Sequence, residues 1–304
     1  MQMMHFQGYE GPWNVLYYGY APAGRANPPD AHTATRRCTQ AMRYHIDTIP
    51  LWDAMKLDGE CLLCALERKT DLGEAERYLG ASVMEPDVRV QVNDKGFCRH
   101  HQAMLFVGEN RLGHALMLES HMIETRDRVK KPFHELRKAA HAYADASLMD
   151  RVTSKGQAAR RKLTEQAGEL AKLSHTCIMC DSIAENMARY RRTFFHLYKT
   201  DTEFRQAFAT GKGLCLPHAA QLLEEAPEKL SPKELADFAD TLCELETRNL
   251  DRMQEDISWF IKKYDYRFGD EPWKNSRDAV ERTVNKLRGW CVGKEPNPEE
   301  KPGF

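Results

Sequence analysis

The sequence predicts an all-α protein made of two pseudo-symmetric helical units, and three observations support this fold class. From about Tyr44 onward, apolar residues recur three and four positions apart, which is typical of amphipathic helices. Alternating apolar and polar runs, which are typical of strands, are nearly absent. A CxxC motif followed by a CxxH motif occurs twice, so we expect each unit to contain one metal site and one long amphipathic helix.

The chain divides into three segments by composition and by the position of the repeat. Residues 1–43 are rich in Gly, Pro and Tyr and lack helical or strand periodicity, so we expect a poorly ordered extension. Residues 44–150 form the predicted first helical metal-binding unit. Residues 151–304 form the predicted second unit, which also carries the C-terminal helices.

The long helix expected in the first unit begins near Arg111 and continues beyond His121. Pro132 falls within the same pattern. Because proline lacks the backbone N–H that the interior of a helix needs, we expect this helix to be interrupted or kinked there.

The second unit contains the best-marked helix start in the chain. Ser231 suits the N-cap position, Pro232 the first helical position and Glu234 the third, which together form a capping-box pattern. Apolar residues then recur at helical spacing as far as about Tyr264. A last short helix is expected at about residues 276–287.

The internal repeat carries the residues that are best suited to bind metal. In the first repeat "CLLC" at 61–64 is followed by "GFCRHH" at 96–101, and in the second "CIMC" at 177–180 is followed by "GLCLPH" at 213–218. Two residues between ligands let both side chains reach one ion when the pair begins a helix, and helix-start amides favour the thiolate. We therefore expect one site within each repeat, formed by Cys61, Cys64, Cys98 and His101 in the first and by Cys177, Cys180, Cys215 and His218 in the second.

Three cysteines and one histidine per site predict two structural zinc ions, because four protein ligands leave no open position. His101 is preferred to His100, since only the third residue after the cysteine is histidine in both repeats. An iron–sulfur cluster on the same residues is the alternative, although most clusters use cysteine alone. Unliganded buried cysteines would account for one CxxC motif, but two copies with CxxH favour metal. A thioredoxin-like pair would accompany a βαβ pattern, and haem attachment needs CxxCH; both are missing.

A series of short motifs runs along the chain in a fixed order: "TIPLWDAM", "CLLCALE", "LGASVMEPDVR", "GFCRHH", "NRLGHALML", "CIMC", "EFRQAF" and "GLCLPH". Through these motifs the chain resembles, over about residues 44–290, an uncharacterised bacterial family named domain of unknown function 6062. The resemblance implies a helical protein with CxxC and CxxH motifs and no assigned activity.

Several other residues admit both a functional and a structural explanation. The segment "KYDYRFGDEPW" at 263–273 could line a pocket or a partner surface, but we expect it to clamp the end of the long helix onto the core. Arg89 and Arg205 each lie 25 residues after the second cysteine of a CxxC motif, and we expect them to bind carboxylates or carbonyls rather than phosphate. Core or surface positions are expected for His114, His121, His134 and His141, and no ligand for Cys38, Cys243 and Cys291.

Composition limits the range of functions. A net charge of −1 provides no overall field that would attract nucleic acid or membrane, and no apolar run is long enough for a membrane span. Without a signal peptide we expect a cytoplasmic protein, where nine cysteines are better explained by metal than by disulfides. P-loop, GxSxG and HExxH motifs are absent, so no enzyme class is assigned.

The sequence thus predicts a metal-binding helical protein that acts as a binding or scaffold protein, with a protein or a polyanion as its partner. One segment suggests an alternative role. Residues 126–172 carry twelve Lys or Arg against six Asp or Glu, which fits either a solvated helical face or a surface that binds a polyanion such as nucleic acid.

Overall fold

The structure of the protein is a computed structural model that describes residues 37–147, 149 and 154–293. The all-α prediction is confirmed, since these residues form helices and no strand. Residues 1–36 of the predicted extension, which comprises residues 1–43, lie outside the described residues. The first described helix begins at Arg37.

The described helices span both halves of the chain. Those before the centre of the chain are α1 (Arg37–Lys56), α2 (Leu62–Leu79), α3 (Pro86–Lys95), α4 (Arg99–Val107) and α5 (Arg111–Ala144), with a 3₁₀ turn η1 (Ala81–Met84) after α2. Those after it are α7 (Ser154–Ser174), α8 (Ile178–Thr200), α9 (Thr202–Thr210), α10 (Leu216–Lys229), α11 (Pro232–Lys262) and α12 (Ala279–Arg288), with a 3₁₀ turn η2 (Tyr266–Phe268) after α11.

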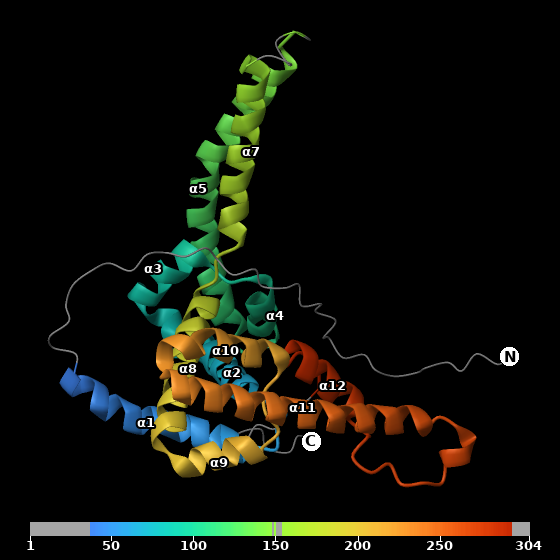
Figure 1. Cartoon of the computed structure of the whole chain (residues 1–304). Coiled ribbons are helices and arrows are strands. Elements are labelled where there is room, and N and C mark those ends of the chain that lie inside the picture. Colours follow the sequence, from blue (N-terminus) through green and yellow to red (C-terminus); the bar gives the residue numbers. More distant parts are fainter. Residues whose placement is uncertain (1–36, 148, 150–153, 294–304) are drawn as a thin grey trace.

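Two of these helices, α5 and α7, form a hairpin that projects from the body of the molecule (Figure 1). The prediction that the helix is interrupted at Pro132 is wrong. Helix α5 is continuous through this residue over its full length of 34 residues, or about 51 Å. Helix α7 packs along α5, and Lys162 of α7 forms an ion pair with Glu135 of α5, one turn beyond the proline. Packing between the two helices thus supports α5 where its own hydrogen bonding is weakened.

The body has two clusters of buried apolar side chains, and each cluster draws on both halves of the chain. The larger one combines Leu51 and Leu63 with a group of aromatic rings in edge-to-face contact, Phe194, Tyr198, Phe204, Phe208 and Phe238. The smaller one combines Val92 and Leu105 with Met179. Aromatic side chains of this size contribute much of the burial that stabilises a core. The division into two pseudo-symmetric units stays a prediction.

Helix α11 begins and ends as its sequence suggests. Its N-terminus is the predicted capping box, in which the Ser231 hydroxyl accepts from the Glu234 N–H at 3.4 Å and the Glu234 carboxylate accepts from the Ser231 N–H at 2.8 Å. At its C-terminus the Lys263 ammonium donates to the carbonyls of Phe268 and Gly269, both at 2.8 Å. Segment 263–273 therefore caps the helix end. It does not clamp this end onto the core as predicted, because Tyr264 and Tyr266 are 75 % and 91 % exposed.

Candidate metal centres

All four motifs of the repeat begin helices. Cys61 and Cys177 are the N-cap residues of α2 and α8, and each sulfur accepts a hydrogen bond from the backbone N–H of the second cysteine of its motif, at 3.4 and 3.5 Å. Cys98 and Cys215 are the N-cap residues of α4 and α10. The second ligand of each motif follows three residues later, about one helical turn on, so both side chains face the same point.

The glycine two residues before each CxxH motif has a backbone conformation that other residues rarely adopt. Gly96 has φ +63° and Gly213 has φ +77°. A Cβ atom at Gly96 would overlap the His121 ring, and one at Gly213 would overlap the Glu246 carboxylate. The glycines of "GFCRHH" and "GLCLPH" are therefore required by both conformation and space.

The eight predicted ligands gather in two clusters, but not in the predicted pairs. Site A consists of Cys61, Cys64, Cys215 and His218, and site B consists of Cys98, His101, Cys177 and Cys180. The prediction that each site forms within one repeat is wrong: the CxxC motif of each repeat meets the CxxH motif of the other. In each site the four ligand atoms lie within 4.8 Å of one another, so each can hold a metal ion.

Helix lengths account for this exchange of partners. Helix α2 carries the chain about 27 Å away from its CxxC motif, and α3, only about 15 Å long, is too short to bring the CxxH motif at the start of α4 back to it. Helix α8 lies beside α2, and the Ser182 hydroxyl near its start donates to the Glu74 carboxylate near the end of α2, at 2.8 Å. The start of α8, with its CxxC motif, is thus at the end of α2 that α4 reaches.

Site A is fully buried. The Nδ1 atom of His218 lies 3.5 Å from the sulfur atoms of both Cys61 and Cys64 and 3.2 Å from that of Cys215. The sulfur atoms of Cys64 and Cys215 are 3.6 Å apart. All four side chains are buried, so a bound ion would be shielded from water.

Site B has similar distances but a more open position. The Nδ1 atom of His101 lies 3.1 Å from the sulfur of Cys177, 3.2 Å from that of Cys98 and 3.4 Å from that of Cys180. The sulfur atoms of Cys98 and Cys180 are 3.7 Å apart. These two cysteines are half-buried, which gives solvent and reagents access to site B that site A does not offer.

A carboxylate of α2 lies behind each ligand histidine. In site B the Nε2 atom of His101 is 3.0 Å from Asp71 Oδ1, and in site A the Nε2 atom of His218 is 3.6 Å from Glu67 Oε2. A carboxylate in this position fixes the orientation of a metal-binding imidazole and leaves the opposite nitrogen, Nδ1, to face the ion. Sequence reasoning missed both residues, although they lie three and seven positions after Cys64 on the face of α2 that carries the ligands.

Electrostatics in site B favour a positively charged species. Burial of His101 opposes its charged form, but hydrogen bonds with Asp71, Cys177 and Cys98 outweigh burial and raise its pKa to about 11. Burial of Asp71 likewise opposes ionisation, but hydrogen bonds with His100 and His101 lower its pKa to about 2. The Asp71 carboxylate and the neighbouring sulfur atoms thus favour a positive charge next to them in the cluster.

The C-terminal helix covers site A. After α12 the chain turns at Gly289, which has φ +86°, and the Trp290 N–H donates to the Cys64 sulfur at 3.3 Å. The Arg68 guanidinium lies 4.4 Å above the Trp290 ring. A hydrogen bond from the backbone to a ligand sulfur stabilises its thiolate form, so this turn supports site A as well as covering it.

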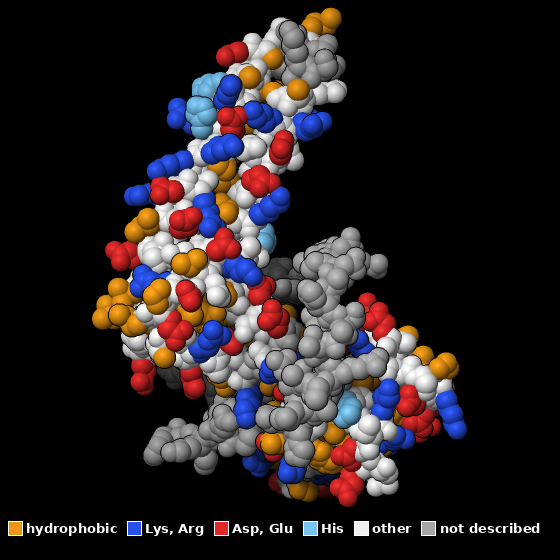
Figure 2. All heavy atoms as spheres, turned by 90° about the vertical axis from the view of Figure 1, so that its left-hand side faces the viewer, with side chains coloured by type: hydrophobic (Ala, Val, Ile, Leu, Met, Phe, Trp, Pro, Cys, Tyr) orange, Lys and Arg blue, Asp and Glu red, His pale blue; other side chains and the backbone are white. Residues whose placement is uncertain are grey.

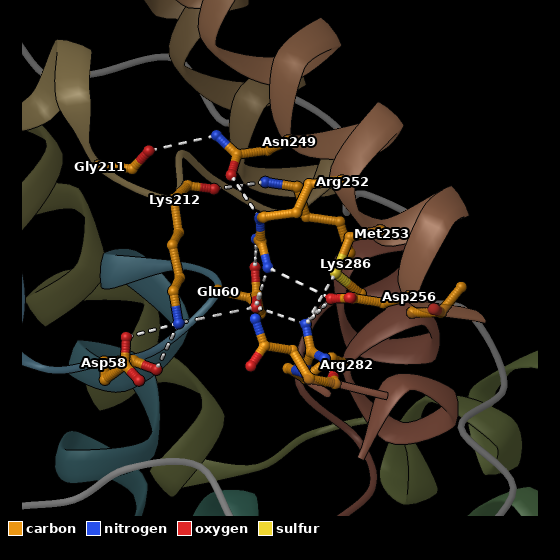
Figure 3. A network of polar contacts seen from close by, with 12 residues as sticks. Asp58, Glu60, Gly211, Lys212, Asn249, Arg252, Met253, Asp256, Arg282 and Lys286 are labelled. Carbon is orange, nitrogen blue, oxygen red and sulfur yellow. Dashed lines mark hydrogen bonds and ion pairs between the residues drawn. The ribbon is translucent and has the colours of Figure 1, made fainter. Parts of the chain in front are cut away.

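A network of charged side chains holds the residue before Cys61 (Figure 3). Glu60 is 3 % exposed, and its carboxylate accepts from Arg252 of α11 at 3.2 Å and from Arg282 of α12 at 3.4 Å. Asp256 of α11 accepts from the same Arg282 guanidinium at 3.0 Å. This network ties the start of α2 to α11 and α12 and so positions the first ligand of site A.

A second buried ion pair holds the residues before Cys215. The Lys286 ammonium of α12 is 1 % exposed and lies 2.8 Å from Glu246 Oε2 of α11. Oε1 of the same carboxylate accepts from the Leu214 N–H at 2.6 Å, and Lys286 also donates to the Lys212 carbonyl at 2.8 Å. Both segments that supply ligands to site A are thus fixed by α11 and α12.

The remaining candidate residues have structural roles. Arg89 donates to the Leu116 carbonyl at 2.8 Å and Arg205 to the Tyr198 carbonyl at 3.0 Å, as expected for residues that bind carbonyls. His114 is buried against Gln102, and His121 bonds the Asn93 carbonyl. Exposed positions are found for His134, His141 and Cys243, and a half-buried one for Cys291. The side chain of Cys38 lies outside the described part of the chain.

Comparison with known proteins gives a family and no activity. A family model described as a family of unknown function (DUF6062) matches residues 42–294, which confirms the resemblance inferred from the motifs. Neither the curated proteins nor the solved structures contain a match to the chain. Among the described helices, none combines the length and the apolar character that crossing a membrane needs.

Proposed function

The chain belongs to a family of unknown function, DUF6062, and we propose that it binds two zinc ions that cross-link its halves into a rigid helical scaffold. The scaffold presents the hairpin of α5 and α7 to a partner. In this proposal the units 44–150 and 151–304 exchange metal ligands instead of each binding an ion alone.

The distances between ligand atoms support a single zinc ion in each site. Zinc bonds of about 2.3 Å to sulfur and about 2.0 Å to nitrogen, arranged as a tetrahedron, separate two sulfur atoms by about 3.8 Å and a sulfur from a nitrogen by about 3.5 Å. One sulfur pair in each site, Cys64 with Cys215 and Cys98 with Cys180, lies 3.6 and 3.7 Å apart, and the sulfur-to-nitrogen distances run from 3.1 to 3.5 Å. All ligand atoms of a site lie within 4.8 Å of one another. This agreement is the observation on which the proposal depends.

The alternative of an iron–sulfur cluster has weaker support. In a cluster the cysteines bind different iron atoms that are separated by bridging sulfides, so their sulfur atoms are spread around a larger object. Here all four ligand atoms lie within 4.8 Å of one another, which suits one ion. Four protein ligands also leave no open position for a substrate, so we assign the ions a structural role rather than a catalytic one.

Zinc would stabilise contacts between residues far apart in the chain. Cys64 and Cys215 are separated by 151 residues, and the entropy cost of closing a loop rises by about 0.6 kcal/mol for each doubling of its length. Metal bonds that form only in the folded state contribute their free energy to folding. Reduced cysteines are needed for this role, which supports a reducing compartment such as the cytoplasm as the location.

Elemental analysis of the full chain, purified without oxygen or added metal, tests the proposal. We expect about two zinc ions per chain, no visible colour, and loss of helical content on treatment with a strong chelator, because two four-ligand sites are present. Iron in more than one equivalent, with a brown colour, would support the cluster instead. A chain that keeps no metal and folds equally well without it would contradict the proposal.

A further inference from the structure

The arm formed by α7 and the outer part of α5 differs in charge from the rest of the chain. Residues 126–172 carry twelve Lys or Arg and six Asp or Glu, a net charge of +6. Since the whole chain carries −1, all other residues together carry −7. A polyanion that approaches the molecule is therefore repelled by the body and attracted to the arm.

Ion pairs with acidic side chains neutralise part of the positive charge on the arm. Lys130 pairs with Asp127 at 2.5 Å, Lys172 pairs with Glu169 at 2.6 Å, and Lys162 pairs with Glu135 across the hairpin. Five other cations are exposed and form no ion pair with any described residue: Lys131, Arg137, Lys138, Arg160 and Arg161. We call these five the basic band.

The basic band occupies one level of the arm. The pair between Glu135 and Lys162 sets which residues of the two helices lie side by side. Lys131 and Lys138 lie one turn to either side of Glu135 on the same helix face, and Arg160 and Arg161 lie directly before Lys162. Lys131 and Lys138 are seven positions apart, a rise of about 10.5 Å, so the five charges of the basic band share a short length of the arm. Figure 2 shows Lys and Arg side chains, interspersed with Asp and Glu, over the visible face of this projecting arm.

We propose that the basic band docks on the phosphate backbone of nucleic acid. A duplex presents one negative charge for about every 1.7 Å of its axis, which matches a dense group of unpaired cations. Two packed helices are about 20 Å wide and exceed the roughly 12 Å width of the major groove, so the arm contacts phosphates and does not read bases.

The packing of the arm argues against a membrane surface as the partner. A helix that lies on a bilayer inserts a broad apolar face between the lipids. In the arm α5 and α7 pack along each other, and Ala139 of α5 is buried. Phe133, 51 % exposed, is the large apolar side chain beside the band, and one aromatic ring suits stacking on a base better than insertion in lipid.

Fluorescence anisotropy with a labelled 20-base-pair DNA duplex and a 20-nucleotide single strand, on the full zinc-loaded chain, tests this inference. Five phosphate contacts predict a slope of log K against log salt of about −4.5 for the duplex and about −3.5 for the single strand. For the duplex this corresponds to a loss of about 500-fold in affinity between 50 and 200 mM salt. No binding of either probe at 50 mM salt would overturn the inference.

Two double variants with the same change in charge locate the contact. The Lys131→Gln/Lys138→Gln variant removes two members of the basic band and should reduce the duplex slope by about 2. In the matched Lys130→Gln/Lys172→Gln variant both lysines already pair with acids of the arm, and a much smaller change is expected. Equal losses in the two variants, or equally tight binding to phosphatidylserine vesicles, would overturn the assignment. Zinc content should stay unchanged in both, which separates this test from that of the metal sites.

Discussion

Cys64 and Cys215 lie 151 residues apart in the chain, yet their sulfur atoms are 3.6 Å apart in site A. Site B repeats the relationship, since Cys98 and Cys180 are 82 residues apart and their sulfur atoms are separated by 3.7 Å. Each cluster therefore joins the CxxC motif of one repeat to the CxxH motif of the other. A change at one motif is expected to affect both halves of the protein.

Replacement of Asp71 by Asn should weaken zinc binding in site B. The carboxylate lies 3.0 Å from His101 Nε2, and loss of such a partner typically lowers metal affinity 10- to 100-fold. Competition with a chromophoric chelator should then resolve one weakened and one unchanged zinc. The matched Glu67→Gln variant should weaken site A by less, because Glu67 lies 3.6 Å from His218 and is half exposed. Equal effects of Asp71→Asn on both sites would contradict this assignment.

If the proposed zinc ions occupy both sites, a thiol-modifying reagent should release them at different rates. Cys98 and Cys180 of site B are half-buried, whereas all four ligands of site A are buried and covered by the turn at Trp290. We expect about one equivalent of zinc to be released in a fast phase and one in a slow phase, because reaction requires access to a thiolate. A time course with a zinc-sensitive dye measures both phases. A single phase would indicate that the two sites are equally accessible.

Substitution of Gly213 by Ala should destabilise the protein. The left-handed backbone costs an alanine roughly 1–2 kcal/mol, and its Cβ would displace the Glu246 carboxylate that holds the Leu214 N–H. Gly168→Ala is the matched control, because Gly168 lies within α7 with open space around it, and alanine there should stabilise by up to about 1 kcal/mol. Chemical unfolding monitored by circular dichroism should give shifts of opposite sign. A neutral Gly213→Ala variant would contradict the argument.

Replacing one partner of the buried ion pair between Glu246 and Lys286 should lower the free energy of unfolding more than replacing both partners together. Lys286→Met leaves a buried carboxylate without its cation, and Glu246→Gln leaves a buried ammonium without its anion; each loss is expected to cost roughly 3 kcal/mol in unfolding free energy. The double variant removes both charges, so its cost should be well below the sum of the single costs. Glutamine keeps an acceptor for the Leu214 N–H. Additive costs would mean that the two groups do not interact.

Much of the fold and the ligand set follow from local sequence signals, because helix caps and ligand spacing are local properties. The capping box at Ser231 and the two CxxC and CxxH motifs could be read from residues within one turn of each other. The pairing of motifs could not, because the spacing is compatible with either arrangement. It depends on how far α2 and α3 carry the chain and on the packing of α8 beside α2.

The carboxylates that contact the ligand histidines could not be predicted from features common to both repeats, because only the first repeat has them. Glu67 and Asp71 follow Cys64 by three and seven residues, but the matching positions after Cys180 are Ile183 and Met187. A search for features shared by both repeats therefore discards them. Helix α2 supplies the carboxylates that contact both ligand histidines, and α8 supplies neither. The two halves therefore contribute unequally to the metal sites.

Zinc content of two double variants tests the crossed arrangement most directly. Cys64→Ser/Cys215→Ser removes two ligands of site A and none of site B, so the account predicts about one zinc per chain. Cys64→Ser/Cys98→Ser removes one ligand from each site and should leave almost none. The reverse result, with about one zinc in the second variant and almost none in the first, would mean that each repeat binds its own ion and would contradict the crossed sites.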